Sequence, residues 1–352
     1  MRRQLFYILI ATVLLAVSCS SQSGDKNSTV SFIDDSANNK IEVKINNKLF
    51  TSLLWTDDVT KPVLYPVCAP SGTEITRGFP LSPRLGERID HAHQIGNWLT
   101  YGDVEGFDFW GNGSRGLGTK NENGGFIKNL KVEKMSGGKG EGKLLTSAAW
   151  VAPTGEEFFK EKTTYCFIAK KEVWIIDRIT TLTAGDKDIS MPDTKEGMFG
   201  IRVARQLELP SGGDVTVYGA GGQPEKIKGA DDKSVTGNYI SSEGVTGEKV
   251  WATRAKWMDL YGNIGNEKIS VVICDHPKNP GYPTYWHARG YGLFAANPLG
   301  WNDFTAKKEQ FNFKIAAGES VTFRYRTVIS SGAHLSPEEI DVLTDEFAGL
   351  YK

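Results

Sequence analysis

Short runs of β-branched and aromatic residues, separated by turns rich in glycine and asparagine, recur along most of the chain. Apolar and polar residues alternate in IEVKINNKLF (41–50) around an Asn-Asn pair, as they do in a β-hairpin. The strand pattern returns in KISVVICD (268–275) and in FNFKIAAGESVTFRYRTVI (311–329), where two strands flank a turn at Ala317-Gly318. The 39 glycines suit a protein with many tight turns. The sequence therefore predicts an all-β protein, a large antiparallel β-sandwich.

One segment, SPEEIDVLTDEFAGLYK (336–352), has helical spacing instead. Ser336 can cap the helix, Pro337 suits its first turn, and Glu339 completes a capping box. Apolar residues recur every three or four positions from Ile340 to Leu350, so one face should dock on the sandwich. We expect a C-terminal helix here.

The N-terminus, MRRQLFYILIATVLLAVSCSS, is typical of a secretory signal. Arg2 and Arg3 precede an apolar stretch (5–17) that is shorter than the roughly 20 residues of a transmembrane helix. Ser18 stands directly before Cys19, as in lipoprotein signals, in which the cysteine thiol receives the lipid. We therefore expect a lipoprotein signal peptide at 1–18, a lipid on Cys19, and a lipid-anchored location in the cell envelope, at the outer membrane or the periplasmic face.

The residues after Cys19 are polar and show no apolar periodicity, which predicts a flexible tether over 19–30 and a single sandwich domain over 31–352. The net charge is −1. Nucleic-acid binding needs a basic surface, so nucleic acid is not an expected partner. The membrane is an expected partner, because the lipid on Cys19 would insert into it.

Four of the five histidines fall in two segments that also carry aromatic and acidic residues. The first, GERIDHAHQIGNWLTYGDVEGFDFWG, contains Asp90, His91, His93, Trp98 and Trp110. On a strand, His91 and His93 would point to one face, about 7 Å apart. This clustering favours one shared site for the four histidines over separate structural roles.

The second segment, DHPKNPGYPTYWHARGYGLFAANPLG, contains Asp275, His276, Asn279, His287, Arg289 and Asn297. It follows an apolar strand and is rich in proline and glycine, a common way to present a site on a rigid scaffold. A third segment, DTKEGMFGIRVA, has Glu196 in a turn and Arg202 within a strand. Arg202 either faces solvent or offers its fork of donors to a sugar hydroxyl or carboxylate.

These segments, together with YPVCAPSGTEITRGFP (65–80) and the closing FRYR, are similar to a bacterial family of unknown function long labelled "methane oxygenase PmoA" (PmoA-like). The resemblance covers essentially the whole mature chain. The family pattern in the first cluster is Asp-His-Pro-His-His, from which Ala92 and Gln94 depart here. The resemblance implies a fold of the galactose-mutarotase-like supersandwich type and a place among Bacteroidetes-type lipoproteins of carbohydrate utilisation. After the signal, the chain shows no apolar stretch of membrane-spanning length. The sequence therefore does not favour methane oxygenation, the activity named in the label.

The leading hypothesis is an envelope enzyme that acts on a sugar or keto-sugar by acid–base chemistry, as an epimerase, a lyase or a glycoside-cleaving enzyme. Proton transfer or ligation would fall to His91, His93, His276 and His287. Sugar binding would fall to Asp90, Trp98, Trp110, Glu196, Arg202, Asp275, Asn279, Arg289 and Asn297. Two alternatives stay open: the histidines hold a divalent metal, or the protein is a non-catalytic glycan-binding lipoprotein.

Overall fold

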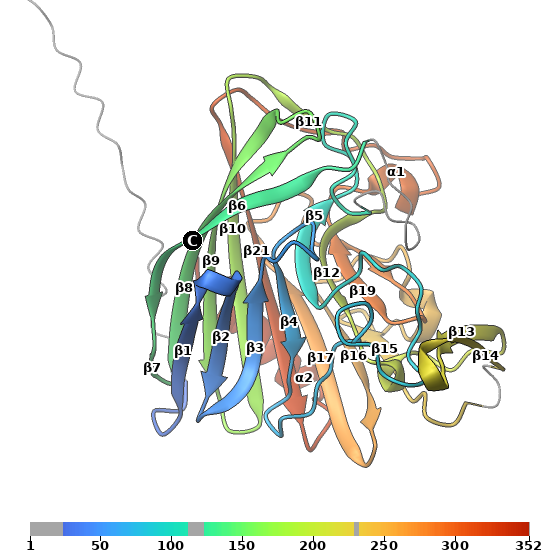
Figure 1. Cartoon of the computed structure of the whole chain (residues 1–352). Helices are drawn as coiled ribbons and strands as arrows, with labels where there is room; N and C mark the ends of the chain where they lie inside the picture. Colours follow the sequence, from blue (N-terminus) through green and yellow to red (C-terminus); the bar gives the residue numbers. More distant parts are fainter. Residues whose placement is uncertain (1–23, 112–122, 229–231, 352) are drawn as a thin grey trace, which may run out of the picture.

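A computed structural model describes residues 24–111, 123–228 and 232–351. The predicted signal peptide and Cys19 lie outside these residues. Within them, strands form a nine-stranded sheet (the larger sheet), an eight-stranded sheet (the smaller sheet) and two short ribbons (Figure 1). Neighbouring strands are antiparallel throughout both sheets, which confirms the predicted antiparallel β-sandwich.

The larger sheet has the strand order β18 (Tyr285–Ala288), β19 (Leu293–Asn297), β12 (Gly197–Arg202), β5 (Asn97–Tyr101), β4 (Val63–Val67), β3 (Lys48–Leu54), β2 (Lys40–Ile45), β1 (Thr29–Asp35) and β7 (Gly138–Lys139). The smaller sheet has the order β15 (Asn238–Ser241), β16 (Trp257–Ile264), β17 (Glu267–Asp275), β21 (Ser320–Ser331), β10 (Val173–Ala184), β9 (Glu157–Ala169), β8 (Glu141–Val151) and β6 (Phe126–Ser136). The ribbons pair β11 (Ile189–Met191) with β20 (Phe313–Ile315), and β13 (Asp214–Tyr218) with β14 (Pro224–Lys228).

The predicted hairpin at 41–50 is confirmed as β2 and β3. Asn46 and Asn47 both have positive φ (52° and 64°), the conformation that a two-residue turn of this kind requires. The turn at Ala317-Gly318 also forms, but the strands beside it do not pair with each other. β21 is already hydrogen-bonded to β10 and β17, so β20 pairs with β11 instead.

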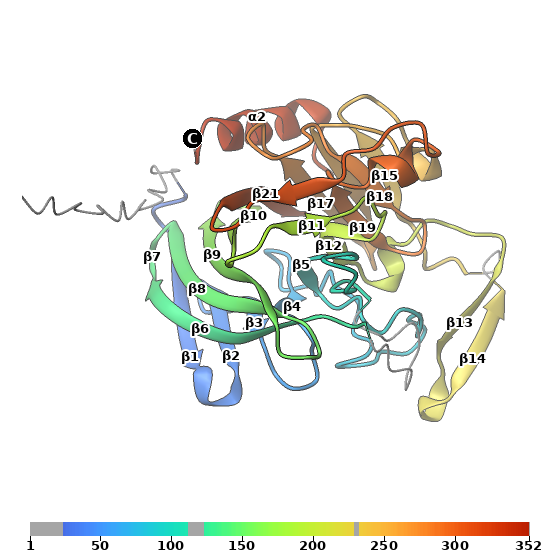
Figure 2. The same cartoon turned by 90° about the horizontal axis from the view of Figure 1, so that it is seen from above.

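The main core lies between the two sheets, and a second apolar cluster covers the outer face of the smaller sheet. The predicted C-terminal helix, α2 (Pro337–Ala348), packs there through Ile340, Leu343 and Phe347. Its capping box between Ser336 and Glu339 is formed. Figure 2 shows α2 on the side of β21 and β10 that faces away from β3 and β4. A short helix, α1 (Trp301–Phe304), follows β19.

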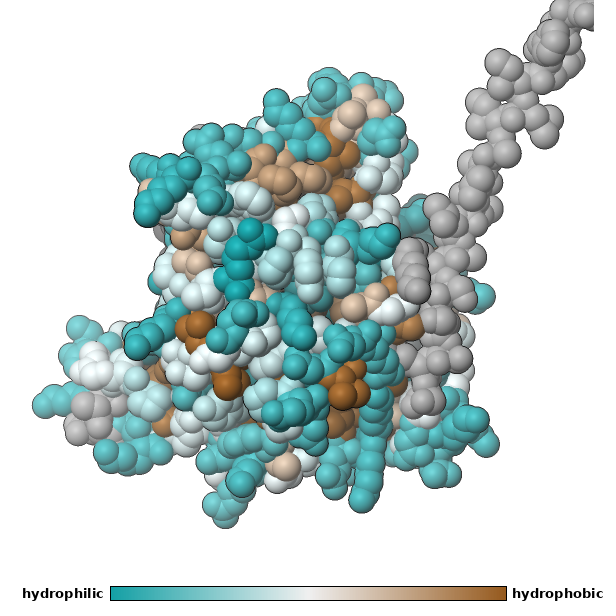
Figure 3. Space-filling view, turned by 180° about the vertical axis from the view of Figure 1, so that it is seen from behind, coloured by the Kyte–Doolittle hydropathy of each residue, from teal (hydrophilic) through white to brown (hydrophobic). Residues whose placement is uncertain are grey.

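The face seen in Figure 3 is largely hydrophilic, with apolar residues scattered among charged ones.

Part of the predicted tether is bound to the sandwich. Asp25 donates its backbone N–H to Ala169 (2.8 Å), Ser28 is buried, and β1 begins at Thr29. The described part of 19–30 is therefore held against the sandwich, which corrects the predicted tether from Gly24 onward. No helix in the described ranges is long and apolar enough to cross a membrane.

Candidate functional site

A row of residues crosses the outer face of the larger sheet. Trp98 on β5, Gly200 on β12, Ala295 on β19 and His287 on β18 stand opposite one another in consecutive strand pairs. Their neighbours along each strand face the main core, because side chains alternate between the two faces of a sheet. Trp98 and His287, from the two predicted segments, therefore share one face.

Two indole rings, those of Trp110 and Trp251, contact His287 on this face, and together with Trp98 we call them the aromatic floor (Trp98, Trp110, Trp251). The Trp98 and Trp110 ring centroids are 5.1 Å apart. Trp110 stacks on His287 at 6.2 Å, and Trp251 meets it edge-on at 5.0 Å. A Cβ atom at Gly200 would come within 2.9 Å of Trp98 and 3.1 Å of Trp110, so glycine leaves room for both indoles.

The aromatic floor carries hydrogen-bonding groups that the described chain does not use. Nε1 of Trp98, Nε1 of Trp110 and Nδ1 of His287 are all buried without a hydrogen-bond partner among the described residues. Buried polar groups are nearly always paired in folded proteins, by protein, water or ligand. Three such groups lie together on this face, and all three side chains are buried.

His287 is 2% exposed. Burial, followed by the positive charge of Arg289, lowers the pKa of His287 to about 3. The ring is therefore neutral at pH 7. Its Nδ1 lies 4.0 Å from Glu196 Oε2. The neutral ring can form a hydrogen bond with a ligand, but it cannot act as a positively charged acid.

His91 is the exposed histidine of the site, with 40% of its side chain accessible. Its Nδ1 lies 3.0 Å from Asp90 Oδ2, and its ring stacks flat on Tyr291 at 5.1 Å. Asp90 also accepts hydrogen bonds at Oδ1 from Arg77 (2.8 Å) and Arg202 (2.7 Å). Burial alone would raise the pKa of Asp90, but Arg202, His91 and Arg77 outweigh it and hold that pKa well below its usual range. The carboxylate is thus a fixed negative charge beside His91.

The prediction that His91 and His93 project from one strand is wrong. Both lie in a turn, closed by the Gln94 N–H donating to the His91 carbonyl (2.9 Å), and His91 has a positive φ of 42°. The turn still brings the rings together, edge to face at 5.7 Å. His93 is 9% exposed and lies behind His91.

Arg202 does not face solvent: it is fully buried. It donates to Asp90 and to the side-chain oxygen of Gln94, and its guanidinium lies 4.8 Å from the Tyr291 ring centroid. Gln94 is thus an acceptor for Arg202. Arg202 positions the Asp90–His91 pair and does not itself contact an open surface.

Two contributors were missed by sequence reasoning. Arg77 donates to the backbone carbonyls of Asp90, His91 and Gln94 and so holds the whole turn. Lys61 donates to the Trp110 carbonyl (3.1 Å) beneath the aromatic floor, and burial lowers its pKa to about 7. Each is a lone basic residue beside an apolar strand, a pattern too common to single out.

The expectation that all four histidines share a pocket is wrong for His276. Its Nε2 lies 3.0 Å from the Leu350 carbonyl and its ring packs edge-on against Phe347 of α2. These contacts are on the outer face of the smaller sheet, on the far side of the sandwich from His91.

Three other predicted binding residues are occupied by their own chain. Asp275 is buried and accepts from Asn279 Nδ2 (2.7 Å) and the Thr284 N–H (2.8 Å). Asn279 also exchanges hydrogen bonds with the backbone of Arg324. Asn297 donates to the Thr194 carbonyl (2.8 Å). These side chains fix loops, so the structure gives them no free group for a ligand.

In the described part of the chain, no three His, Cys, Asp or Glu side chains come together as a set that could hold a metal ion.

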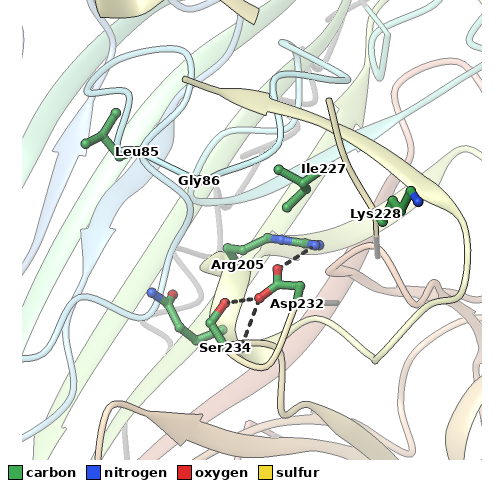
Figure 4. Close-up of a pocket in the computed structure, with 8 residues that line it drawn as sticks. Leu85, Gly86, Arg205, Ile227, Lys228, Asp232 and Ser234 are labelled. Atoms are coloured by element: carbon green, nitrogen blue, oxygen red, sulfur yellow. Dashed lines mark hydrogen bonds and ion pairs between the residues drawn. The ribbon is translucent and has the colours of Figure 1, made fainter. Parts of the chain in front are cut away.

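A cavity of about 420 Å³ lies beside the β13–β14 ribbon, and none of the predicted site residues lines it. Figure 4 shows Arg205 paired with Asp232 across it, at 2.9 Å. The Asp232 carboxylate also accepts from Ser234, so both charges are already satisfied.

A protein-family model described as "Family of unknown function (DUF6807)" matches residues 40–345. No curated protein matches the chain.

Several solved structures resemble it distantly. The galactosidase domain of the α-galactosidase–sucrose kinase AgaSK has a TM-score of 0.38 at 9% identity, over 86% of this chain and 42% of that one. The α-galactosidase AgaB from Geobacillus stearothermophilus gives 0.37 at 10%, over 86% and 41%. A protein from Synechocystis sp. PCC 6803 gives 0.31 at 10%, over 87% and 96%. The chain thus spans less than half the length of the two galactosidases, and likenesses at this level carry no argument on function.

Proposed function

The chain belongs to this family of unknown function (DUF6807), and from its own site we propose that it processes a carbohydrate by acid–base chemistry on the outer face of the larger sheet. His91 would transfer the proton, and the aromatic floor would bind the sugar. The observation that carries the proposal is the Asp90–His91 pair, 3.0 Å apart, with His91 close enough to His287 for its charge to affect the pKa of that ring.

The Asp90–His91 pair supports proton transfer. A carboxylate next to Nδ1 of an imidazole fixes the ring orientation and its tautomer, which leaves Nε2 for a substrate. Asp90 is itself held by Arg77 and Arg202, so the pair is rigid. Imidazole is the side chain whose charge change falls between pH 5 and 8, which suits it to acid–base catalysis.

The aromatic floor supports a sugar as the ligand. Trp251, the part-exposed indole of the floor, can meet the C–H face of a pyranose, whereas Trp98 and Trp110 are buried and form the support behind it. The neutral His287 adds one more hydrogen-bonding atom at the same place. Epimerisation, elimination and glycosidic cleavage all use a positioned acid or base of this kind.

The unused donors also favour a second candidate, a non-catalytic glycan-binding protein, since they need no proton transfer to act. The discriminating experiment incubates the purified protein with a panel of glycosides and their keto derivatives, and follows both binding and product by NMR spectroscopy. Product formation supports the enzyme. Binding without turnover supports the binding protein, and the absence of both contradicts the proposal.

We also propose that the protein is anchored in the cell envelope by lipid on Cys19. The support is the sequence: two arginines, an apolar stretch, and Ser18 before Cys19. Cys19→Ala should abolish partitioning into the detergent phase in detergent phase separation, whereas the parent protein expressed in a bacterial envelope should partition there. Partitioning that survives the substitution would show that the anchor is elsewhere.

A further inference from the structure

We propose that the sugar bound at this site is acidic, with a carboxylate held by Arg289, as in a hexuronate. This inference rests on the proposed function and names its substrate class. The central carbon of the Arg289 guanidinium lies over the Trp251 ring, 3.7 Å from its centroid. Among the described residues, no carboxylate lies within 4.0 Å of it and no hydrogen-bond acceptor is bound by it. It is half-buried, so it is held in place yet open to a ligand.

Arg289 differs in this from the other arginines around it. Arg77 and Arg202 share Asp90, and Arg205 is paired with Glu208 and Asp232. Arg254, which also lies over aromatic rings, donates to the carbonyls of Gly281, Tyr282 and Pro283. Arg289 alone of these keeps its full set of donors. A planar guanidinium fits a carboxylate with two parallel hydrogen bonds.

The surroundings of Arg289 also favour an anion. Trp251, beneath the guanidinium, touches His287 edge-on at 5.0 Å, and the buried Nδ1 of His287 lacks a partner among the described residues. Trp98 and Trp110, on the same face, are buried and extend the apolar surface beside Trp251. A carboxylate only accepts hydrogen bonds, so it suits the free donors of Arg289 better than a hydroxyl does.

The charges near the site point in the same direction. Asp90 and Glu196 already have cations as partners: Asp90 has Arg77 and Arg202, and Glu196 has Lys195 at 3.2 Å. Arg289 has no such partner among the described residues, and beside an apolar floor its attraction to an anion is screened less than in open water. The geometry places that anion over the Trp251 end of the aromatic floor.

The test compares binding of methyl glucuronoside and methyl galacturonoside with binding of the neutral methyl glucoside and methyl galactoside, by calorimetry. We expect the acids to bind about 10- to 100-fold more tightly, the usual value of a charge-assisted pair. Arg289→Gln should remove that preference, so that the acids and the neutral sugars bind the variant with similar affinity. Lys131→Gln, which removes the same charge from the exposed edge strand β6 of the other sheet, is the matched control and should keep the preference.

The outcomes separate the two proposals. Equal binding of acidic and neutral sugars, or an acid preference that persists in Arg289→Gln, overturns the acidic-sugar inference and leaves the proposed function standing. No binding of any of the four glycosides by the parent protein counts against both. A thermal melt of each variant, expected within a few degrees of the parent, shows that a lost preference is not a lost fold.

Discussion

Replacing His91 with glutamine should lower turnover of a sugar substrate by about 10²–10⁴-fold, the usual contribution of one positioned acid or base. Glutamine can still hydrogen-bond but cannot exchange a proton near pH 7. Because 40% of the His91 side chain is exposed, the fold should tolerate the change. The measurement is kcat on the substrate found in the glycoside panel, with a thermal melt alongside.

The matched control is His276→Gln. That histidine lies against Leu350 and Phe347 on the other side of the sandwich, so its loss should leave kcat within about twofold while it lowers the melting temperature. Full turnover in His91→Gln would refute the catalytic assignment. Equal losses in both variants would show that unfolding, and not chemistry, is being measured.

Arg326→Met should lower the free energy of unfolding by about 3–5 kcal/mol. Arg326 donates from Nε and Nη2 to the two oxygens of Asp177, at 2.7 and 2.8 Å, and neither side chain is exposed. It also donates to the Leu343 carbonyl of α2 (2.9 Å). Without the guanidinium, Asp177 becomes a buried charge with only the Tyr351 hydroxyl as a side-chain donor. Urea unfolding measures the change.

The double variant Arg326→Met/Asp177→Leu checks that cause. Removing both charges takes away the uncompensated carboxylate, so the double variant should recover at least half of the stability lost in the single one. If the double variant is no more stable than Arg326→Met, the loss comes from packing against α2 and not from the buried charge.

Local features were predictable from the sequence because their causes are local. The Asn46-Asn47 hairpin follows from two residues that tolerate positive φ, and α2 follows from a capping box beside helical periodicity. Strand partners were less predictable. The strands beside Ala317-Gly318 looked like a hairpin, but β21 is bound on both edges by strands that are distant in sequence.

The candidate site was predictable only in part, because the chain changes sheets within the second histidine segment. β17 ends at Asp275 in the smaller sheet, and β18 begins at Tyr285 in the larger one. His276 and His287 are therefore close in sequence but separated by the thickness of the sandwich. Conversely, Arg202 meets Asp90 across 112 positions, a pairing that no local pattern reveals.

The most direct test of the proposed site is NMR spectroscopy of the protein labelled with ¹⁵N at its five histidines, each signal assigned by its His→Gln variant. The sugar that binds best in the panel is then added. We expect the ring signals of His91 and His287 to shift on binding. The ring signals of His276 and His334 should not shift. The Nε2 atom of His276 lies 3.0 Å from the Leu350 carbonyl, after α2, and that of His334 lies 2.9 Å from the Gly262 carbonyl on β16 of the smaller sheet. Saturable sugar binding that leaves His91 and His287 unchanged would contradict the account.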